Sequence, residues 1–107
     1  NVASFVEAYR GSPEVMKEIL AIFQEETPEK LQRLESALDE GDLHTVDRTA
    51  HSLANTAGTL RAEEAVAAAR ETESAAREGN AETARGAASR LCEHVRTMLE
   101  QIAALDL

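Results

Sequence analysis

Hydrophobic residues recur along most of the chain at spacings of three and four, which is the period of an amphipathic helix. From Leu43 to Leu60, and again from Ala84 to Leu105, apolar positions advance by alternating steps of three and four residues. A broader apolar face runs from Val15 to Phe23 and continues from Leu31 to Leu38. No segment shows the sustained apolar–polar alternation with β-branched residues that is typical of strands. The pattern therefore predicts an all-α fold.

Short helix-capping and helix-ending motifs separate these helical segments. The stretch "GSPEVMKE" offers Ser12 as an N-cap with a proline directly after it, and "ETPEK" repeats this arrangement with Thr27 and Pro28. The second motif predicts that the helix through Phe23 is either kinked or restarted there. The motifs "EGD" (40–42) and "EGN" (78–80) each place a helix-ending glycine before an N-capping residue.

These boundaries divide the chain into four long helices and one short one. The segment "AEEAVAAARETESAAREG" has only small apolar residues and is expected to pack closely against its neighbours. The opening "VASFVEAY" predicts a short extra helix that covers one end of the bundle. We expect residues 1–107 to form a single domain, because this length supports one modest hydrophobic core.

The composition of the chain argues against some classes of partner and favours one cellular compartment. The formal net charge is −9, which argues against a nucleic-acid partner, because binding to phosphate backbones requires a basic face. No apolar run approaches the length needed to span a membrane. A single cysteine, Cys92, excludes an intramolecular disulfide and fits a reducing compartment such as the cytoplasm.

The candidate site is the histidine in "HSLANTAGTL", His51 to Leu60. The apolar seam of this helix is centred between the rows of Ala50 and Leu53. Because successive helical residues turn by about 100°, His51 should point roughly 130° away from that centre. We therefore expect His51 to face solvent near the middle of a helix.

The residues around His51 favour contact with another protein. Beyond the histidine the outer strip becomes small and uncharged, whereas an ordinary exposed helix face carries Glu and Lys pairs. A flat surface of this kind lets a partner approach the imidazole. The predicted docking residues are His44, Arg48, Ser52, Ala54, Asn55 and Gly58.

Other kinds of site fit less well. His44 and His51 are two turns apart and no cysteine joins them, so a metal site is not expected. Neither a nucleophile elbow nor a glycine-rich phosphate loop is present, which argues against a hydrolase and a self-contained kinase. An ordinary solvated surface histidine remains the alternative.

The stretch "AHSLANTAGTLRAEE" resembles the motif of histidine-containing phosphotransfer (HPt) domains. In that motif the histidine is followed by a hydroxyl residue, a Leu or Ile, a Lys-Gly pair and later a Leu-Gly-Ala. The similarity extends to "SPEVMKEILAIFQEETPEKLQRLESALDEGDLHTVDRTAHSL". The resemblance implies an up-down antiparallel four-helix bundle with a short additional N-terminal helix.

The resemblance also implies a function. His51 would accept a phosphoryl group from a histidine kinase or a receiver aspartate and pass it to a receiver aspartate of a response regulator. The chain would be a phosphocarrier more than a true enzyme. It would need no cofactor or metal of its own, because Mg²⁺ would belong to the receiver partner. Neither nucleic acid nor a membrane would be contacted.

The chain departs from the family motif at three positions. Ala54 and Asn55 replace the Lys-Gly pair, and Arg61 replaces the glycine of Leu-Gly-Ala. The first change removes a cation near the expected phosphoryl group, and the second adds bulk where glycine allows close approach. We expect both changes to lower the efficiency of transfer. A degenerate HPt-like interaction module, which binds a receiver or kinase without efficient phosphotransfer, therefore remains the alternative function.

Overall fold

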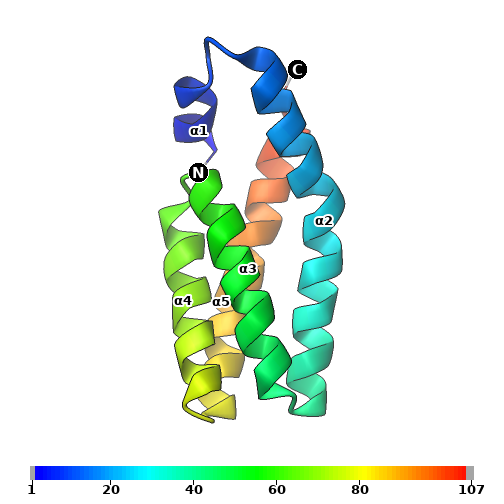
Figure 1. Cartoon of the computed structure of the whole chain (residues 1–107), viewed down its shortest axis with the longest axis vertical. Coiled ribbons are helices and arrows are strands. Elements are labelled where there is room, and N and C mark those ends of the chain that lie inside the picture. The colour runs from blue at the N-terminus through cyan, green and yellow to red at the C-terminus, as the bar shows by residue number, and fades with distance from the viewer. Residues whose placement is uncertain (1, 106–107) are drawn as a thin grey trace.

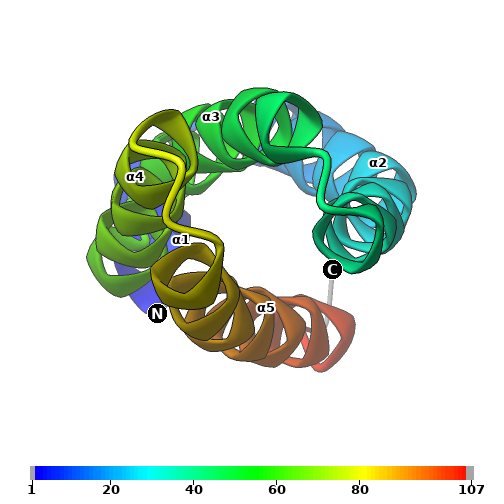
Figure 2. The same cartoon turned by 90° about the horizontal axis from the view of Figure 1, so that it is seen from below.

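The computed structural model describes residues 2–105, which form five helices and no strand. The helices are α1 (Ala3–Ala8), α2 (Pro13–Glu40), α3 (Leu43–Thr59), α4 (Glu63–Arg77) and α5 (Ala81–Ala103). The four long helices run up and down in antiparallel order (Figure 1). Seen end-on, they follow one another around the bundle in chain order (Figure 2). The predicted fold class, including the short N-terminal helix, is confirmed.

Two glycines end helices as the motifs predict. Gly41 and Gly79 have φ angles of 71° and 75°, in the left-handed region that glycine adopts without a steric penalty. The next residue in each case caps the following helix. The side chains of Asp42 and Asn80 each accept a hydrogen bond from the backbone N–H three residues later, at 3.2 and 3.1 Å.

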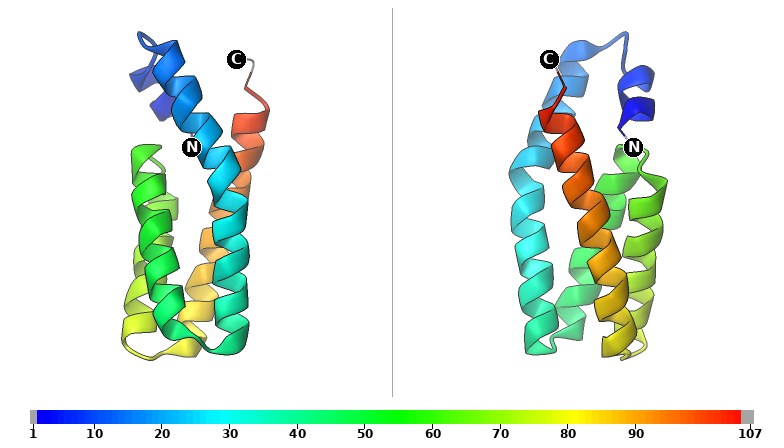
Figure 3. Two further views of the ribbon diagram at one scale, coloured as in Figure 1. Left: turned by 45° about the vertical axis from the view of Figure 1, so that its right-hand side comes forward. Right: turned by 180° about the vertical axis from the view of Figure 1, so that it is seen from behind.

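Helix α2 passes through Pro28 without ending. Its first half is inclined to its second half (Figure 3), so of the two predicted outcomes a kink is found and a restart is not. Proline lacks an N–H and cannot complete the helical hydrogen bonding, but apolar residues on both sides of it enter the same core. Thr27 is not a cap. It is fully buried, and its hydroxyl has no hydrogen-bond partner among the described residues.

The core combines large side chains from three helices with small ones from α4. Leu34, Leu53 and Leu91, from α2, α3 and α5, are completely buried, and burying each stabilises the fold by roughly 1.5–3 kcal/mol. Helix α4 packs most extensively, against α3 and α5. All of its buried residues except Glu73 have small side chains, which confirms the expected close packing: they are Ala65, Ala68, Ala69, Thr72, Glu73, Ala75 and Ala76.

Helix α1 lies against one end of the bundle (Figure 1). Phe5 is completely buried there, with its ring centroid 4.7 Å from that of Tyr9. The backbone N–H of Val2 donates to Gln101 Oε1 of α5 at 3.4 Å. Within residues 2–105, no helix has the length and hydrophobicity that crossing a membrane requires.

Candidate functional site

His51 lies in the middle of α3 with 52 % of its side chain exposed. Ala50, Leu53 and Ala57 are buried on the opposite side of the helix. The predicted placement of His51 on the outer face is therefore confirmed. Its exposure leaves the imidazole accessible to another molecule.

The ring of His51 is held by a carboxylate from the neighbouring helix. His51 Nδ1 lies 2.6 Å from Glu73 Oε2 of α4, and the Glu73 side chain is only 7 % exposed. Two unprotonated acceptors would repel each other at this distance, so Nδ1 carries a proton and donates it to the carboxylate. In the neutral imidazole the remaining nitrogen, Nε2, then has a free lone pair.

Two arginines keep Glu73 ionised. Arg70 Nη1 donates to Glu73 Oε1 at 3.1 Å, and Arg77 Nη2 donates to Glu73 Oε2 at 2.9 Å. Burial is the largest single influence on the pKa of Glu73 and raises it. The hydrogen bonds from His51 and Arg70, with the charge of Arg77, together outweigh burial, so this pKa lies below its ordinary value. The carboxylate can therefore orient the imidazole at neutral pH.

The two arginines are themselves fixed by further contacts. Arg77 Nε donates to both carboxylate oxygens of Asp47, at 3.1 and 3.2 Å. Arg70 Nη2 donates to Asn55 Oδ1 at 3.5 Å, and Arg70 Nη1 lies 3.3 Å from His51 Nδ1. Because Nδ1 already donates to Glu73 and a guanidinium can only donate, the last approach is a contact and not a hydrogen bond.

The predicted docking residues do not all share the exposed strip. His44, Arg48, Asn55 and Gly58 are exposed, and Ser52 is half-buried. Ala54 is only 2 % exposed, so its expected position at the edge of the strip is wrong. The reason is the neighbouring helix: α4 packs closely on this side of α3 and covers the Ala54 methyl group within the core.

Two shallow cavities border the exposed side of α3, and His51 lines one of them. One, of about 230 Å³, is lined by His44, Asp47, Arg48, His51 and Arg77, which makes the surface on this side of the ring predominantly basic. The other, of about 270 Å³, lies between α2 and α3 and is more apolar; it is lined by Ile19, Ile22, Phe23, Asn55, Thr56, Thr59 and Leu60. Ile22 at its rim is half exposed.

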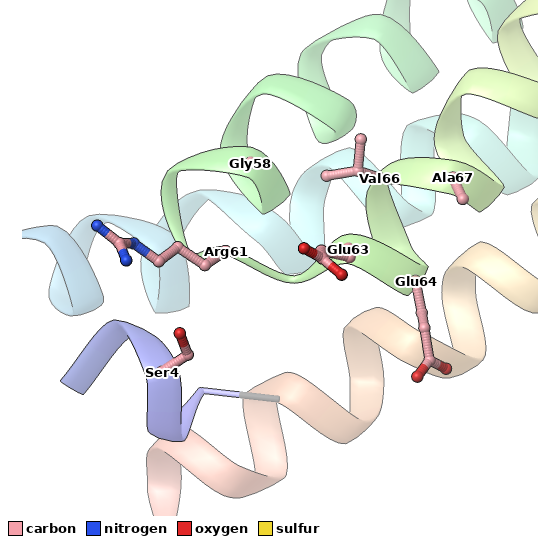
Figure 4. Close-up of a pocket in the computed structure, with 7 residues that line it drawn as sticks. All are labelled: Ser4, Gly58, Arg61, Glu63, Glu64, Val66 and Ala67. Atoms are coloured by element: carbon pink, nitrogen blue, oxygen red, sulfur yellow. The ribbon is translucent and has the colours of Figure 1, made fainter. Parts of the chain in front are cut away.

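A larger surface cavity, of about 780 Å³, lies at the α3–α4 connection (Figure 4). It is bordered by Ser4 of α1 and by residues around the α3–α4 connection, including Arg61, Glu63 and Glu64. Arg61, where the HPt motif has glycine, adopts a left-handed backbone with φ of 58°. His51 does not line this cavity, but Gly58, one of the predicted docking residues, does.

Sequence reasoning missed Glu73 and Arg70. One available signal was the position of Glu73 in α4, four residues after Ala69 and three before Ala76. This spacing places a carboxylate on the buried row of an alanine-rich helix, where a charge requires partners. Arg70 is one turn before Glu73, but no pattern in α4 indicates that its side chain reaches Asn55 of α3.

Among residues 2–105, no group of three or more His, Cys, Asp or Glu side chains is arranged to hold a metal ion. The family model described as "Hpt domain" matches residues 18–105. No curated protein and no solved structure is significantly similar to the chain.

Proposed function

The chain belongs to the Hpt domain family, and on that premise we propose that His51 is its phospho-accepting residue. Hpt domains take part in histidine phosphotransfer in phosphorelays and interact with receiver domains and kinases. In the proposed reaction His51 accepts a phosphoryl group from a kinase or a receiver aspartate and passes it to a receiver aspartate. The domain acts as a phosphocarrier in this reaction.

The observation that carries this proposal is the contact between His51 Nδ1 and Glu73 Oε2 at 2.6 Å. A nucleophilic imidazole needs one nitrogen with a free lone pair directed at the phosphorus atom. Glu73 holds the proton on Nδ1 and fixes the ring, which leaves Nε2 as the nucleophile. An ordinary surface histidine has no need of a buried, charge-stabilised carboxylate.

The transfer step follows from this tautomer. Nε2 attacks the phosphorus of the aspartyl phosphate, the new N–P bond forms, and the bond to the aspartyl oxygen breaks. The aspartate leaves as a carboxylate, while the proton on Nδ1 stays in place. The ring thereby gains a positive charge beside the Glu73 carboxylate, which stabilises the product. The reverse sequence delivers the phosphoryl group to the next aspartate.

The surroundings of His51 suit a receiver domain as the partner. Receiver phosphorylation sites are acidic and hold the Mg²⁺ of the reaction, so the metal ion need not come from this domain, which contributes an oriented nucleophile. Arg48 is exposed and forms no ion pair within residues 2–105, so it is free to meet an acidic surface. The proposed docking surface comprises His44, Arg48, Ser52, Asn55 and Gly58, with Ile22 across the apolar cavity that Asn55 also lines.

The test is phosphorylation of the whole chain by phosphoramidate, a small phosphodonor for histidine, and by a receiver charged with acetyl phosphate. His51→Gln should abolish acid-labile labelling from both donors. It should change the free energy of unfolding by no more than about 0.5 kcal/mol, because the side chain is exposed. The Gln amide can also still donate to Glu73.

The matched controls are His44→Gln and His94→Gln. With phosphoramidate each should keep the label at the parent rate; with the receiver as donor His94→Gln should also do so, whereas His44→Gln, which changes the proposed docking surface, should slow the transfer. Phosphoramidate labelling that survives His51→Gln, or is lost with either control, would show that His51 is not the acceptor. A parent chain that binds a receiver but takes up no label from it would favour the degenerate interaction module.

A further inference from the structure

We propose that Arg70 is the cation that binds the phosphoryl group on His51, and that Asn55 positions its guanidinium. This inference rests on the proposed function of His51. It assigns to a neighbouring helix the positive charge that the HPt motif carries on a lysine three residues after the histidine. The Ala54-Asn55 pair is then part of an alternative arrangement and does not weaken the site.

The guanidinium of Arg70 lies beside the reacting ring. Its Nη1 is 3.3 Å from His51 Nδ1 and 3.1 Å from Glu73 Oε1, and its Nη2 is 3.5 Å from Asn55 Oδ1. Glu73 anchors one end of the guanidinium and Asn55 the other. Nε2 lies across the same small ring from Nδ1, so the half-exposed Arg70 side chain has to turn past the edge of the ring to bring its charge to a phosphoryl group on Nε2.

Arg70 also retains donors for phosphoryl oxygens. A guanidinium has five N–H groups, and the contacts to Glu73 and Asn55 engage two of them. Its side chain is 48 % exposed, so the remaining N–H groups can reach a group attached from solvent. Arg77, in contrast, donates to both oxygens of Asp47 and to Glu73, and its hydrogen bonds are committed to the network.

The packing explains why the cation comes from α4. At position 54, which carries the lysine in the HPt motif, this chain has an alanine buried within the core. A lysine there would have to leave that buried position to reach solvent. Arg70 starts from an exposed position on α4 and crosses to α3, where Asn55 stands one turn after His51.

The experiment measures phosphorylation of the whole chain by phosphoramidate, which needs no partner protein. In this step the donor's P–N bond breaks, ammonia leaves, and the new bond forms at Nε2. Arg70→Gln should slow the reaction about tenfold, because charge-assisted contacts to phosphate are roughly twice as strong as neutral ones. Arg70→Lys should recover part of the rate. Arg90→Gln is the matched control, since the Arg90 side chain is similarly exposed and also forms an ion pair with a glutamate of α4, Glu71, at 2.8 Å.

Asn55 is tested by a double-mutant cycle. Asn55→Gly should slow the parent severalfold but should have no further effect in the Arg70→Gln background, because Asn55 acts through Arg70. A second readout is ³¹P NMR titration of the phosphorylated chain. Loss of the neighbouring cation should raise the pKa of the phosphoryl group, a shift that Arg90→Gln should not produce.

The outcomes separate this inference from the proposed function. If Arg70→Gln reacts at the parent rate with an unshifted phosphoryl pKa, Arg70 is not the cation, whereas loss of label in His51→Gln still supports His51 as the acceptor. If Asn55→Gly accelerates the reaction, the side chain obstructs the site and the positioning role is wrong. If His51→Gln retains the label, both the proposed function and this inference are overturned.

Discussion

Helix α4 presents a glutamate to a histidine on each of its two neighbours, with very different results. Toward α3, Glu73 Oε2 lies 2.6 Å from His51 Nδ1; toward α5, Glu64 Oε2 lies 3.8 Å from His94 Nδ1. The Glu73 side chain is 7 % exposed and that of Glu64 is 86 % exposed. The same two residue types thus form a rigid, oriented pair on one face and a loose surface contact on the other.

Burial and the surrounding cations account for this difference. Glu73 has lost most of its contact with water, so it needs the hydrogen bonds from His51, Arg70 and Arg77 to remain ionised. Glu64 is hydrated, so solvent can replace its contact with His94 at little cost. A carboxylate fixes the tautomer of a histidine only where water cannot compete for it.

The largest expected effect comes from removing the oriented carboxylate. Glu73→Ala should slow phosphorylation of His51 by about ten- to a hundredfold, because a hydrogen bond to a charged group contributes roughly 1.5–3 kcal/mol. Glu73→Gln should be slowed less, since its amide oxygen can still accept the proton on Nδ1. The measurement is the labelling rate with phosphoramidate.

Glu64→Ala is the matched change on the other face of α4 and should leave the labelling rate unchanged. Equal rates for Glu73→Ala and the parent would mean that the imidazole needs no orientation by α4. The difference between the His51–Glu73 and His94–Glu64 pairs would then not explain why His51 is reactive.

A smaller effect is expected in the acid stability of the fold. The pKa of Glu73 is lowered from 4.5 in the folded chain, so its ionisation stabilises the fold fully above that pH. This stabilisation is lost as the pH falls through the lower, folded-state pKa. Urea unfolding from neutral pH to about pH 3 should therefore show a steeper loss of stability for the parent than for Glu73→Gln.

A second carboxylate also contributes to acid sensitivity. Hydrogen bonds from the side chain and backbone of Thr45 lower the pKa of Asp42, so the Glu73→Gln variant should keep some pH dependence. Glu64→Gln serves as the control and should reproduce the parent profile. A parallel profile for Glu73→Gln and the parent would contradict the stabilising role of the ionised carboxylate.

The smallest effects are expected from two exposed glycines, one on each of the helices that flank α4. Gly58 lies in the last turn of α3 near His51, and Gly86 lies within α5, one turn before Arg90. A methyl group at Gly58 would meet Val66 Cγ2 at an ordinary 3.9 Å, and one at Gly86 would meet nothing within 4 Å. Alanine at either position should therefore stabilise the fold, by up to about 1 kcal/mol, in thermal or urea unfolding.

The two variants should differ only when a receiver is the donor. Gly58→Ala should slow transfer from a charged receiver if Gly58 belongs to the docking surface, whereas Gly86→Ala should not. With phosphoramidate both should react at the parent rate. Identical rates for both variants with the receiver would remove Gly58 from the docking surface.

The periodic apolar seams made the helices and the exposure of His51 predictable. Leu53 and Ala57 face inward because a regular helix fixes their angle from His51, and that angle depends on sequence spacing alone. Gly41 and Asp42 were similarly predictable, since their roles in the turn are local. These features require no knowledge of how the helices pack.

Ala54 and Arg70 were not predictable in this way. Whether Ala54 is exposed depends on how closely α4 approaches α3, and the reach of Arg70 to Asn55 depends on the alignment of the two helices along their axes. Both are properties of a pair of helices, and the spacing within one helix does not determine them. Only Glu73 could have been identified from the spacing within its own helix, because that spacing places its charge on the buried side of α4.

The alanines on the buried side of α4 bear on how this domain can evolve. A single base change converts an alanine codon to glycine, serine, threonine, valine, proline, aspartate or glutamate, and of these only glycine is smaller. Glycine costs about 1 kcal/mol in a helix, and the larger residues would force α4 away from the helices that it packs against. Nearly every accessible mutation at Ala65, Ala69 or Ala76 would therefore be selected against, and lineages should drift slowly along this seam while the exposed faces of the bundle diversify.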